Sequence, residues 1–79
     1  MSETYQSTRA RMELQEIEES IARDVQQLRD SLDGFETDVE HGLETSPLNI
    51  VERAARLCLK SGRRAELIRA LARIEGRTL

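Results

Sequence analysis

Aromatic residues are nearly absent from this sequence of 79 residues, which contains one Phe, one Tyr and no Trp. The four Gly and the single Pro are too few to supply the turns of a small β-sandwich or barrel. Leu, Ile, Val and Phe together number 19, which lies above the usual range of disordered chains. Because a chain of this length has room for one core only, we expect a single all-α domain.

Cysteine and histidine each occur once, as Cys58 and His41. One Cys cannot close an intrachain disulfide, and one Cys with one His cannot build a structural zinc site. Cys58 lies between two Leu residues, where a small core residue is the expected role. We therefore expect a reducing compartment and no bound metal ion.

Apolar runs are short, since none exceeds three residues. A membrane-spanning helix needs about 20 mainly apolar residues, so we expect none. Residues 1–6 also lack the basic and apolar segments that form a secretion signal. A cytoplasmic location is the expectation that follows.

Groups that could perform chemistry are sparse. His41 lies near Glu40 and Glu44 but has no nucleophile beside it, so we expect a surface histidine. The acidic residues between positions 13 and 19 are typical of a solvated helix face, and the Gly residues are too dispersed for a phosphate-binding loop. We expect a protein that is not an enzyme and that binds no cofactor.

Large apolar residues recur at helical spacing through the first half of the chain. Their steps of three or four residues predict a long, coiled-coil-like amphipathic helix over residues 8–44, preceded by a flexible segment over residues 1–7. Gly34 weakens this helix and leaves two alternatives, a continuous or kinked helix and a pair of helices that divides there. The apolar residues concerned are Leu14, Ile17, Ile21, Val25, Leu28, Leu32, Phe35, Val39 and Leu43.

A second helical region begins at Ser46 and Pro47, with Ser46 as the N-cap and Pro47 in the first helical position. Ser61 and Gly62 predict a break between helices over residues 47–60 and about 63–75. Residues 47–76 would then form a short αα-hairpin. Its expected core consists of Ile50, Val51, Ala54, Leu57, Leu67, Leu71 and Ile74.

The relative lengths of these helices predict a binding partner. A straight helix over residues 8–44 would be about 55 Å long, whereas each shorter helix would be about 20 Å long. Because the short hairpin cannot cover the long helix, part of the apolar stripe requires a helix from an identical or a different chain, in a homo- or hetero-oligomer. The residues expected to face that partner are Leu14, Ile17, Ile21, Val25 and Leu28.

A small protein–protein interaction module is the function that this arrangement favours. It would act as an adaptor or as a chaperone-type subunit that shields an amphipathic helix of its partner. In size and acidity the chain is similar to the small helical chaperones of secretion systems, and the likeness is one of general character only.

Charge is distributed unevenly along the chain. Residues 1–46 carry twelve acidic and four basic residues, a net charge of −8, whereas residues 47–79 carry eight basic and three acidic residues, a net charge of +5. Such halves attract each other within one chain or across two. The basic half leaves nucleic-acid binding or transcription regulation as an alternative function, although the helix over residues 63–75 lacks Asn and Gln to read bases. The candidate phosphate contacts are Arg63, Arg64, Arg69, Arg73 and Arg77.

Overall fold

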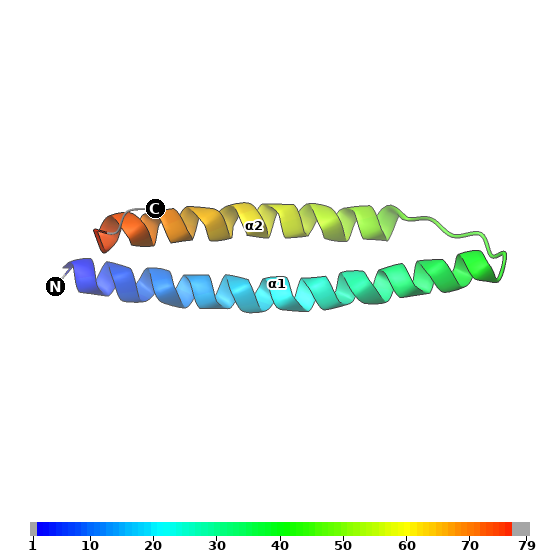
Figure 1. Cartoon of the computed structure of the whole chain (residues 1–79), viewed down its shortest axis with the longest axis horizontal. Coiled ribbons are helices and arrows are strands. Elements are labelled where there is room, and N and C mark those ends of the chain that lie inside the picture. The colour runs from blue at the N-terminus through cyan, green and yellow to red at the C-terminus, as the bar shows by residue number, and fades with distance from the viewer. Residues whose placement is uncertain (1, 77–79) are drawn as a thin grey trace.

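The fold is an antiparallel pair of helices (Figure 1). The structure, a computed structural model, describes residues 2–76, with side chains described from Tyr5 onward. Helix α1 spans Ser2–Glu40 and helix α2 spans Leu48–Ile74, and the described residues contain no strand. The predicted all-α fold with a long N-terminal helix is therefore confirmed.

Helix α1 passes through Gly34 without interruption, so the alternative of two helices dividing there is wrong. Its half-buried residues keep a heptad spacing on both sides of the glycine, and packing along this seam offsets the cost of about 1 kcal/mol that Gly carries inside a helix. The helix also begins at Ser2, earlier than predicted. Residues 2–7 of the segment expected to be flexible are thus helical, and Met1 lies outside the described residues.

Gly42 ends α1. Its φ of +70° is a left-handed conformation that Gly adopts without steric cost. The Leu43 amide donates to the Asp38 carbonyl at 2.9 Å, and the Gly42 amide donates to the Val39 carbonyl at 3.0 Å, which together form a Schellman motif. The helix therefore stops at Glu40, earlier than the predicted boundary at residue 44.

Helix α2 is a single helix, so the predicted break at Ser61 and Gly62 is wrong. Gly62 does not have a positive φ, and the residues that face α1 keep the same helical spacing before and after it. Lys60 contacts α1 before the glycine, and Leu67 is buried after it. Packing along α1 thus overrides the local preference for a turn. The hairpin is formed by α1 and α2 and not within residues 47–76.

The start of α2 lies close to the predicted position. Pro47 is the N-cap and Leu48 is the first helical residue, one position later than expected. The Pro47 carbonyl accepts hydrogen bonds from the amides of Ile50 and Val51, and the Ser46 hydroxyl accepts one from the Leu48 amide at 3.3 Å. Ser46 therefore still partners a backbone group at the helix start.

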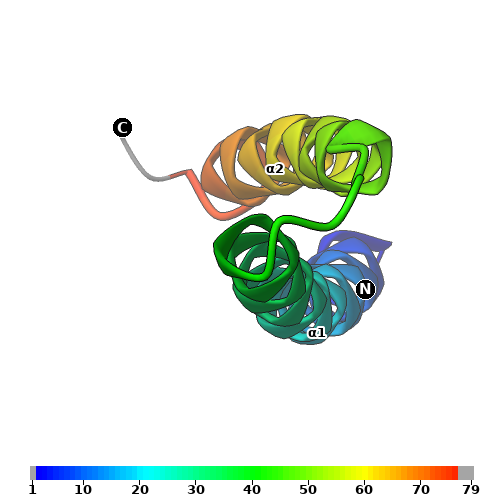
Figure 2. The same ribbon diagram turned by 90° about the vertical axis from the view of Figure 1, so that its right-hand side faces the viewer.

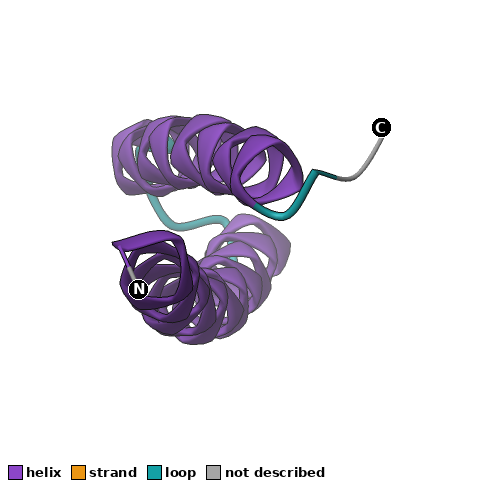
Figure 3. Cartoon of the chain, turned by 90° about the vertical axis from the view of Figure 1, so that its left-hand side faces the viewer, coloured by secondary structure: helices purple, strands orange, loops and turns teal. Residues whose placement is uncertain are grey.

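The core is thin because only two helices face each other (Figures 2 and 3). Leu67 and Leu71 were predicted as core residues and are buried, whereas Val51 is 59% exposed and Cys58 is exposed, so both of those predictions are wrong. One face of a two-helix hairpin has no second layer to cover it, which is the physical reason. The other predicted core residues, all half-buried, are Ile50, Ala54, Leu57 and Ile74. The buried residues of the described chain are Ala10, Leu67, Leu71 and Ala72.

Polar contacts between the helices follow the predicted charge asymmetry, within one chain. They join acidic groups of α1 mainly to basic groups of α2 along the seam. The contacts are Lys60 Nζ to Asp24 Oδ2 at 2.5 Å, Arg63 to Glu13 at 3.1 Å, Arg64 to Glu18 at 2.9 Å, Arg53 to Gln27 at 2.8 Å, and Ser7 and Arg11 to Glu75. Such partly exposed pairs add little stability each, but together they define the antiparallel register.

The two helices do not end at the same level. The contact between Gln27 and Arg53 places Leu48, the first residue of α2, about level with Leu32 of α1. The last turns of α1 extend past that level, and only the loop runs beside them (Figure 1). The molecule, 61 Å in its longest dimension, thus has one end at which a single helix stands without a helical neighbour.

Candidate functional site

The stripe predicted to face a partner lies inside the hairpin. All five residues are half-buried, on the side of α1 that also carries Ser20 and Asp24, whose side chains bind Lys60 of α2. Because α2 is one helix of 27 residues, it is about 40 Å long and reaches along the whole stripe. The structure therefore does not leave this stripe as an open edge. Its residues are Leu14, Ile17, Ile21, Val25 and Leu28.

Exposed apolar side chains gather instead at the loop end of the hairpin. The buried residues of the described chain lie near the opposite end, where the N-terminal part of α1 meets the C-terminal part of α2. Tyr5 and Met12 are the large apolar residues exposed at that opposite end. The large apolar residues exposed from the loop end to the middle of α2 are Leu32, Val39, Leu43, Leu48, Val51 and Leu59.

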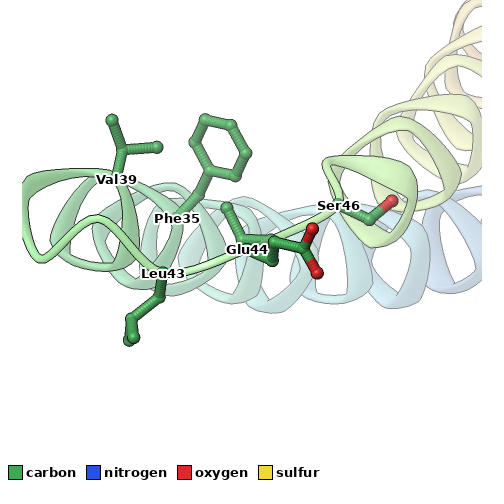
Figure 4. Close-up of a pocket in the computed structure, with 6 residues that line it drawn as sticks. Phe35, Val39, Leu43, Glu44 and Ser46 are labelled. Carbon is green, nitrogen blue, oxygen red and sulfur yellow. The ribbon is translucent and has the colours of Figure 1, made fainter.

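A hollow of about 620 Å³ lies between the end of α1 and the loop, and we call it the loop-end hollow. Phe35 and Val39 project from the same side of α1, and the loop passes across the helix beside them (Figure 4). The hollow is open to solvent, and Val39 is 56% exposed. Its lining residues are Phe35, Val39, Leu43, Glu44, Thr45 and Ser46.

The loop-end hollow exists because the apolar seam of α1 is longer than α2. Phe35 continues the heptad spacing of the seam beyond Leu32, which is level with the first residue of α2. A helix covers the seam up to this level, and an extended loop replaces it afterwards (Figure 1). A loop covers much less apolar surface than a helix does, so the seam ends in an uncovered section.

Acidic residues surround the hollow. The segment from Asp30 to Glu52 contains seven acidic residues and neither Lys nor Arg. Successive helical residues differ by about 100° around the axis, so residues that directly precede or follow Phe35 and Val39 flank them on either side. We call these flanking residues, together with one on the loop, the acidic rim. They are Glu36, Asp38, Glu40 and Glu44.

A second apolar surface lies on the face of α2 that points away from α1, and we call it the outer stripe. Leu48, Val51, Ala55 and Cys58 follow steps of three, four and three, as in the seam of a coiled coil, and Leu59 lies four residues after Ala55. All of them are exposed, and Leu59 reaches 76%. The outer stripe consists of Leu48, Val51, Ala55, Cys58 and Leu59.

The basic residues considered for nucleic-acid binding are divided by the fold. Arg63 and Arg64 pair with Glu13 and Glu18 of α1, so their charge is largely neutralised within the chain. Arg69 and Arg73 are exposed on α2. Arg77 lies outside the described residues. The part of the chain that the structure describes therefore presents no continuous basic surface built from all these residues.

One polar cluster crosses the middle of the seam. Lys60 donates hydrogen bonds to the Ser20 hydroxyl at 2.6 Å and to the Asp24 carboxylate at 2.5 Å. The hydrogen bond from Lys60 holds the pKa of Asp24 below its ordinary value, against the opposing effect of desolvation. Because this pair lies among apolar seam residues, it favours one register of α2 on α1.

The residues that could take part in chemistry lie apart from one another. His41 is exposed, with its Nδ1 2.7 Å from the Thr37 carbonyl oxygen, and Cys58 is exposed on the outer stripe. Within residues 2–76 no three His, Cys, Asp or Glu side chains are grouped so that they could hold a metal ion. Neither described helix has a segment long and apolar enough to cross a membrane.

Sequence reasoning included Phe35, Val39 and Leu43 in the apolar spacing but assigned the partner surface to residues 14–28. That assignment depended on the predicted break at Gly62, since two short helices would have left residues 14–28 uncovered. The run of acidic residues from Asp30 to Glu52 without a basic residue is the signal that distinguishes the loop end. Comparison with protein-family models, with curated proteins and with solved structures finds none that matches this chain.

Proposed function

We propose that this chain is a non-enzymatic, helix-binding interaction module whose loop-end hollow accepts a basic amphipathic helix of another protein. An adaptor or chaperone-type role and a cytoplasmic location belong to the same proposal. The observation that carries it is the apolar seam of α1, which continues past the start of α2 and is left beside a loop.

The apolar part of the hollow fits the side of a helix. Phe35 and Val39 are four residues apart on α1, and Leu43 adds an apolar side chain from the loop. A partner helix with apolar residues at spacings of three and four would pack on them as α2 packs on the earlier part of the seam. Each large side chain that becomes fully buried contributes about 1.5–3 kcal/mol before the costs of association.

The acidic rim selects the charge of the partner. With Glu36 and Glu40 on one flank of Phe35 and Val39, and Asp38 on the other, a helix with Lys or Arg beside its apolar face is attracted from both sides. An acidic helix of the same apolar pattern is repelled. Because Glu36, Glu40 and Glu44 are exposed and Asp38 is only half-buried, this attraction weakens as salt screens it.

Nucleic-acid binding has less support than helix binding. Arg63 and Arg64, two of the candidate phosphate-binding residues, form ion pairs with acidic residues of α1 inside the hairpin. The loop end, with its seven acidic residues, would repel a polyanion along a large part of the molecule. Helix binding is therefore the favoured function.

A synthetic peptide tests the proposal. The probe is a labelled amphipathic peptide of about 18 residues with Leu on one face and Lys on the other, and its binding is followed by fluorescence anisotropy. We expect binding that weakens as salt is raised from about 50 to 300 mM, and a loss of at least about tenfold in affinity for Val39→Asp, which is about 1.4 kcal/mol.

Two controls make the result specific. Met12→Asp changes an apolar residue that is about as exposed as Val39 but lies at the opposite end of the molecule. The affinity of this variant for the peptide should stay within about twofold of that of the unmodified chain. A peptide with Glu in place of Lys should not bind. Equal binding by the Val39→Asp variant, or equal binding of the Glu peptide, would contradict the proposal. Circular dichroism of both variants checks that the helices are retained.

A further inference from the structure

We infer that the outer stripe of α2 is a homodimer interface, in which a second copy of this chain packs its own α2 antiparallel to the first about a two-fold axis near Ala55. The interface is separate from the loop-end hollow and does not depend on the function proposed for it. It would convert two hairpins into a four-helix arrangement with the two α2 helices at the centre.

The position of the outer stripe excludes α1 as the element that covers it. Leu57 and Lys60 lie on the inner face of α2 and are half-buried, whereas Val51, Ala55 and Cys58 are exposed. Leu48, Val51, Ala55 and Cys58 follow steps of three, four and three, which is the spacing of a second coiled-coil seam on the same helix. A helix that is apolar on two opposite faces requires a neighbour on each face.

The surface area of the chain is too large for a compact monomer. Its accessible surface is 6109 Å², whereas a compact monomer of 9.0 kDa exposes about 4,850 Å². The chain therefore exposes roughly a quarter more surface than its mass requires. The elongated shape of the hairpin, with extents of 61 × 17 × 15 Å, produces this excess, and the exposed apolar side chains of the outer stripe are part of it.

The extent of the outer stripe fits a symmetric contact. Beyond Gly62 the same face of α2 carries Glu66, Arg69 and Arg73, so the apolar contact is limited to residues 48–62, about 22 Å of helix. Ala55 is at the midpoint of this segment. A two-fold axis there lays the whole segment on its own copy, and the small side chain at the axis lets the two helices approach closely.

Charges beside the outer stripe select the antiparallel orientation. Glu52 and Arg56 are both exposed and lie four residues apart on α2, and the charge of Arg56 also acts on Asp24 of α1. With the axis near Ala55, Glu52 of one copy comes nearly level with Arg56 of the other, and symmetry forms this pair twice. In a parallel dimer the two-fold axis runs along the helices and puts the Glu52 and Arg56 side chains of the two copies on opposite flanks of the contact, so this pair does not form.

The mass of the protein in solution is the first test. Light scattering should give about twice the chain mass of 9.0 kDa at high concentration and should approach 9.0 kDa on dilution. Val51→Asp should remain near 9.0 kDa at all concentrations, whereas Met12→Asp, equally exposed but outside the stripe, should still dimerise. A chain mass of 9.0 kDa at about 100 μM, or an undiminished dimer of Val51→Asp, would overturn the inference.

Disulfide trapping tests the orientation. In a Cys58→Ser background, the antiparallel contact places residue 48 opposite residue 62 of the other copy. A mixture of Leu48→Cys and Gly62→Cys chains should form the mixed disulfide on mild oxidation, because their Cα atoms come within about 7 Å. Two Leu48→Cys chains should not form a disulfide with each other, and neither should two Gly62→Cys chains. A disulfide of Leu48→Cys with itself would indicate a parallel dimer and would overturn the inference.

The two proposals fail separately. Val51→Asp should lose the dimer and keep its affinity for the basic peptide, whereas Val39→Asp should lose affinity for the peptide and keep the dimer. An absence of dimers together with normal peptide binding would therefore contradict only this inference.

Discussion

Glycine 42 and the pair formed by Asp24 and Lys60 show how single residues determine the geometry of the hairpin. Gly42 ends α1 by taking a left-handed conformation, and the chain turns there into the loop that lines the hollow. Lys60 binds Asp24 and Ser20 across the seam, which places a charge pair where a shifted register would leave it without a partner. Gly42 thus sets where the uncovered last turns of α1 end, and the Asp24–Lys60 pair sets how far α2 reaches along α1.

Substitution of Gly42 should therefore destabilise the fold. Gly42→Ala places a Cβ on a residue with φ of +70°, which costs about 1–2 kcal/mol. Gly34→Ala is the matched control, because Gly34 is helical and an added Cβ meets no atom within 4 Å. We expect it to stabilise the protein by about 0.4–1 kcal/mol. Thermal denaturation of both variants measures the difference, and equal shifts of the same sign would be inconsistent with the turn described.

The stability contributed by Asp24 should depend on pH. Its pKa is lowered by Lys60, so the contribution is present above the pKa of the unfolded chain and is lost as the pH falls through the lower pKa of the folded state. Asp24→Asn should lower the melting temperature at pH 7, and the difference from the unmodified chain should shrink below about pH 4. Asp33→Asn, at an exposed position of α1, is the control for the loss of a carboxylate. A constant difference between pH 7 and pH 3 would argue against the pair.

At the scale of the element, the continuity of α2 is the feature that most affects the proposed function. As one helix it covers residues 14–28 of α1 and leaves the hollow at Phe35 and Val39 uncovered. If α2 were two short helices with a turn at Gly62, residues 14–28 of α1 would be left uncovered. The location of the proposed binding surface thus depends on the conformation of one glycine.

Gly62→Ala tests this directly. Because Gly62 is helical and an added Cβ meets no atom within 4 Å, Ala should raise stability by about 0.4–1 kcal/mol, or roughly 2–8 °C in melting temperature for a domain of this size. Gly76→Ala is the opposing control, since Gly76 has a φ of +69° and Ala should lower stability there. A decrease for Gly62→Ala, measured at low protein concentration, would indicate a turn in place of the helix.

The sequence predicted the helical class, the continuous apolar spacing of α1 and the start of α2 within one residue. These depend on local rules, which are the spacing of apolar residues and the preferences of Ser46 and Pro47 for a helix start. It did not predict that α2 continues through Gly62, because seam packing on α1 compensates the cost of a glycine and acts between segments far apart in the sequence. The exposure of Val51 and Cys58 was missed for the same reason: a wide apolar surface on α2 looks buried until the number of helices around it is known.

At the scale of the whole molecule, the two ends of the hairpin differ in how well their apolar side chains are covered. Ion pairs and buried residues join the helices where the N-terminal part of α1 meets the C-terminal part of α2. The other end carries an uncovered apolar seam, an acidic rim and the first residues of the outer stripe. One end thus holds the hairpin together, and the other leaves apolar side chains exposed, where we propose that other helices bind.

A nuclear magnetic resonance titration tests this account most directly. The uniformly ¹⁵N-labelled chain is titrated with the basic amphipathic peptide, and the shift of each backbone amide is followed. The account predicts that the largest shifts fall within residues 35–46, around Phe35, Val39 and Leu43. Largest shifts within residues 14–28, or no shifts at peptide concentrations that saturate the anisotropy signal, would contradict it.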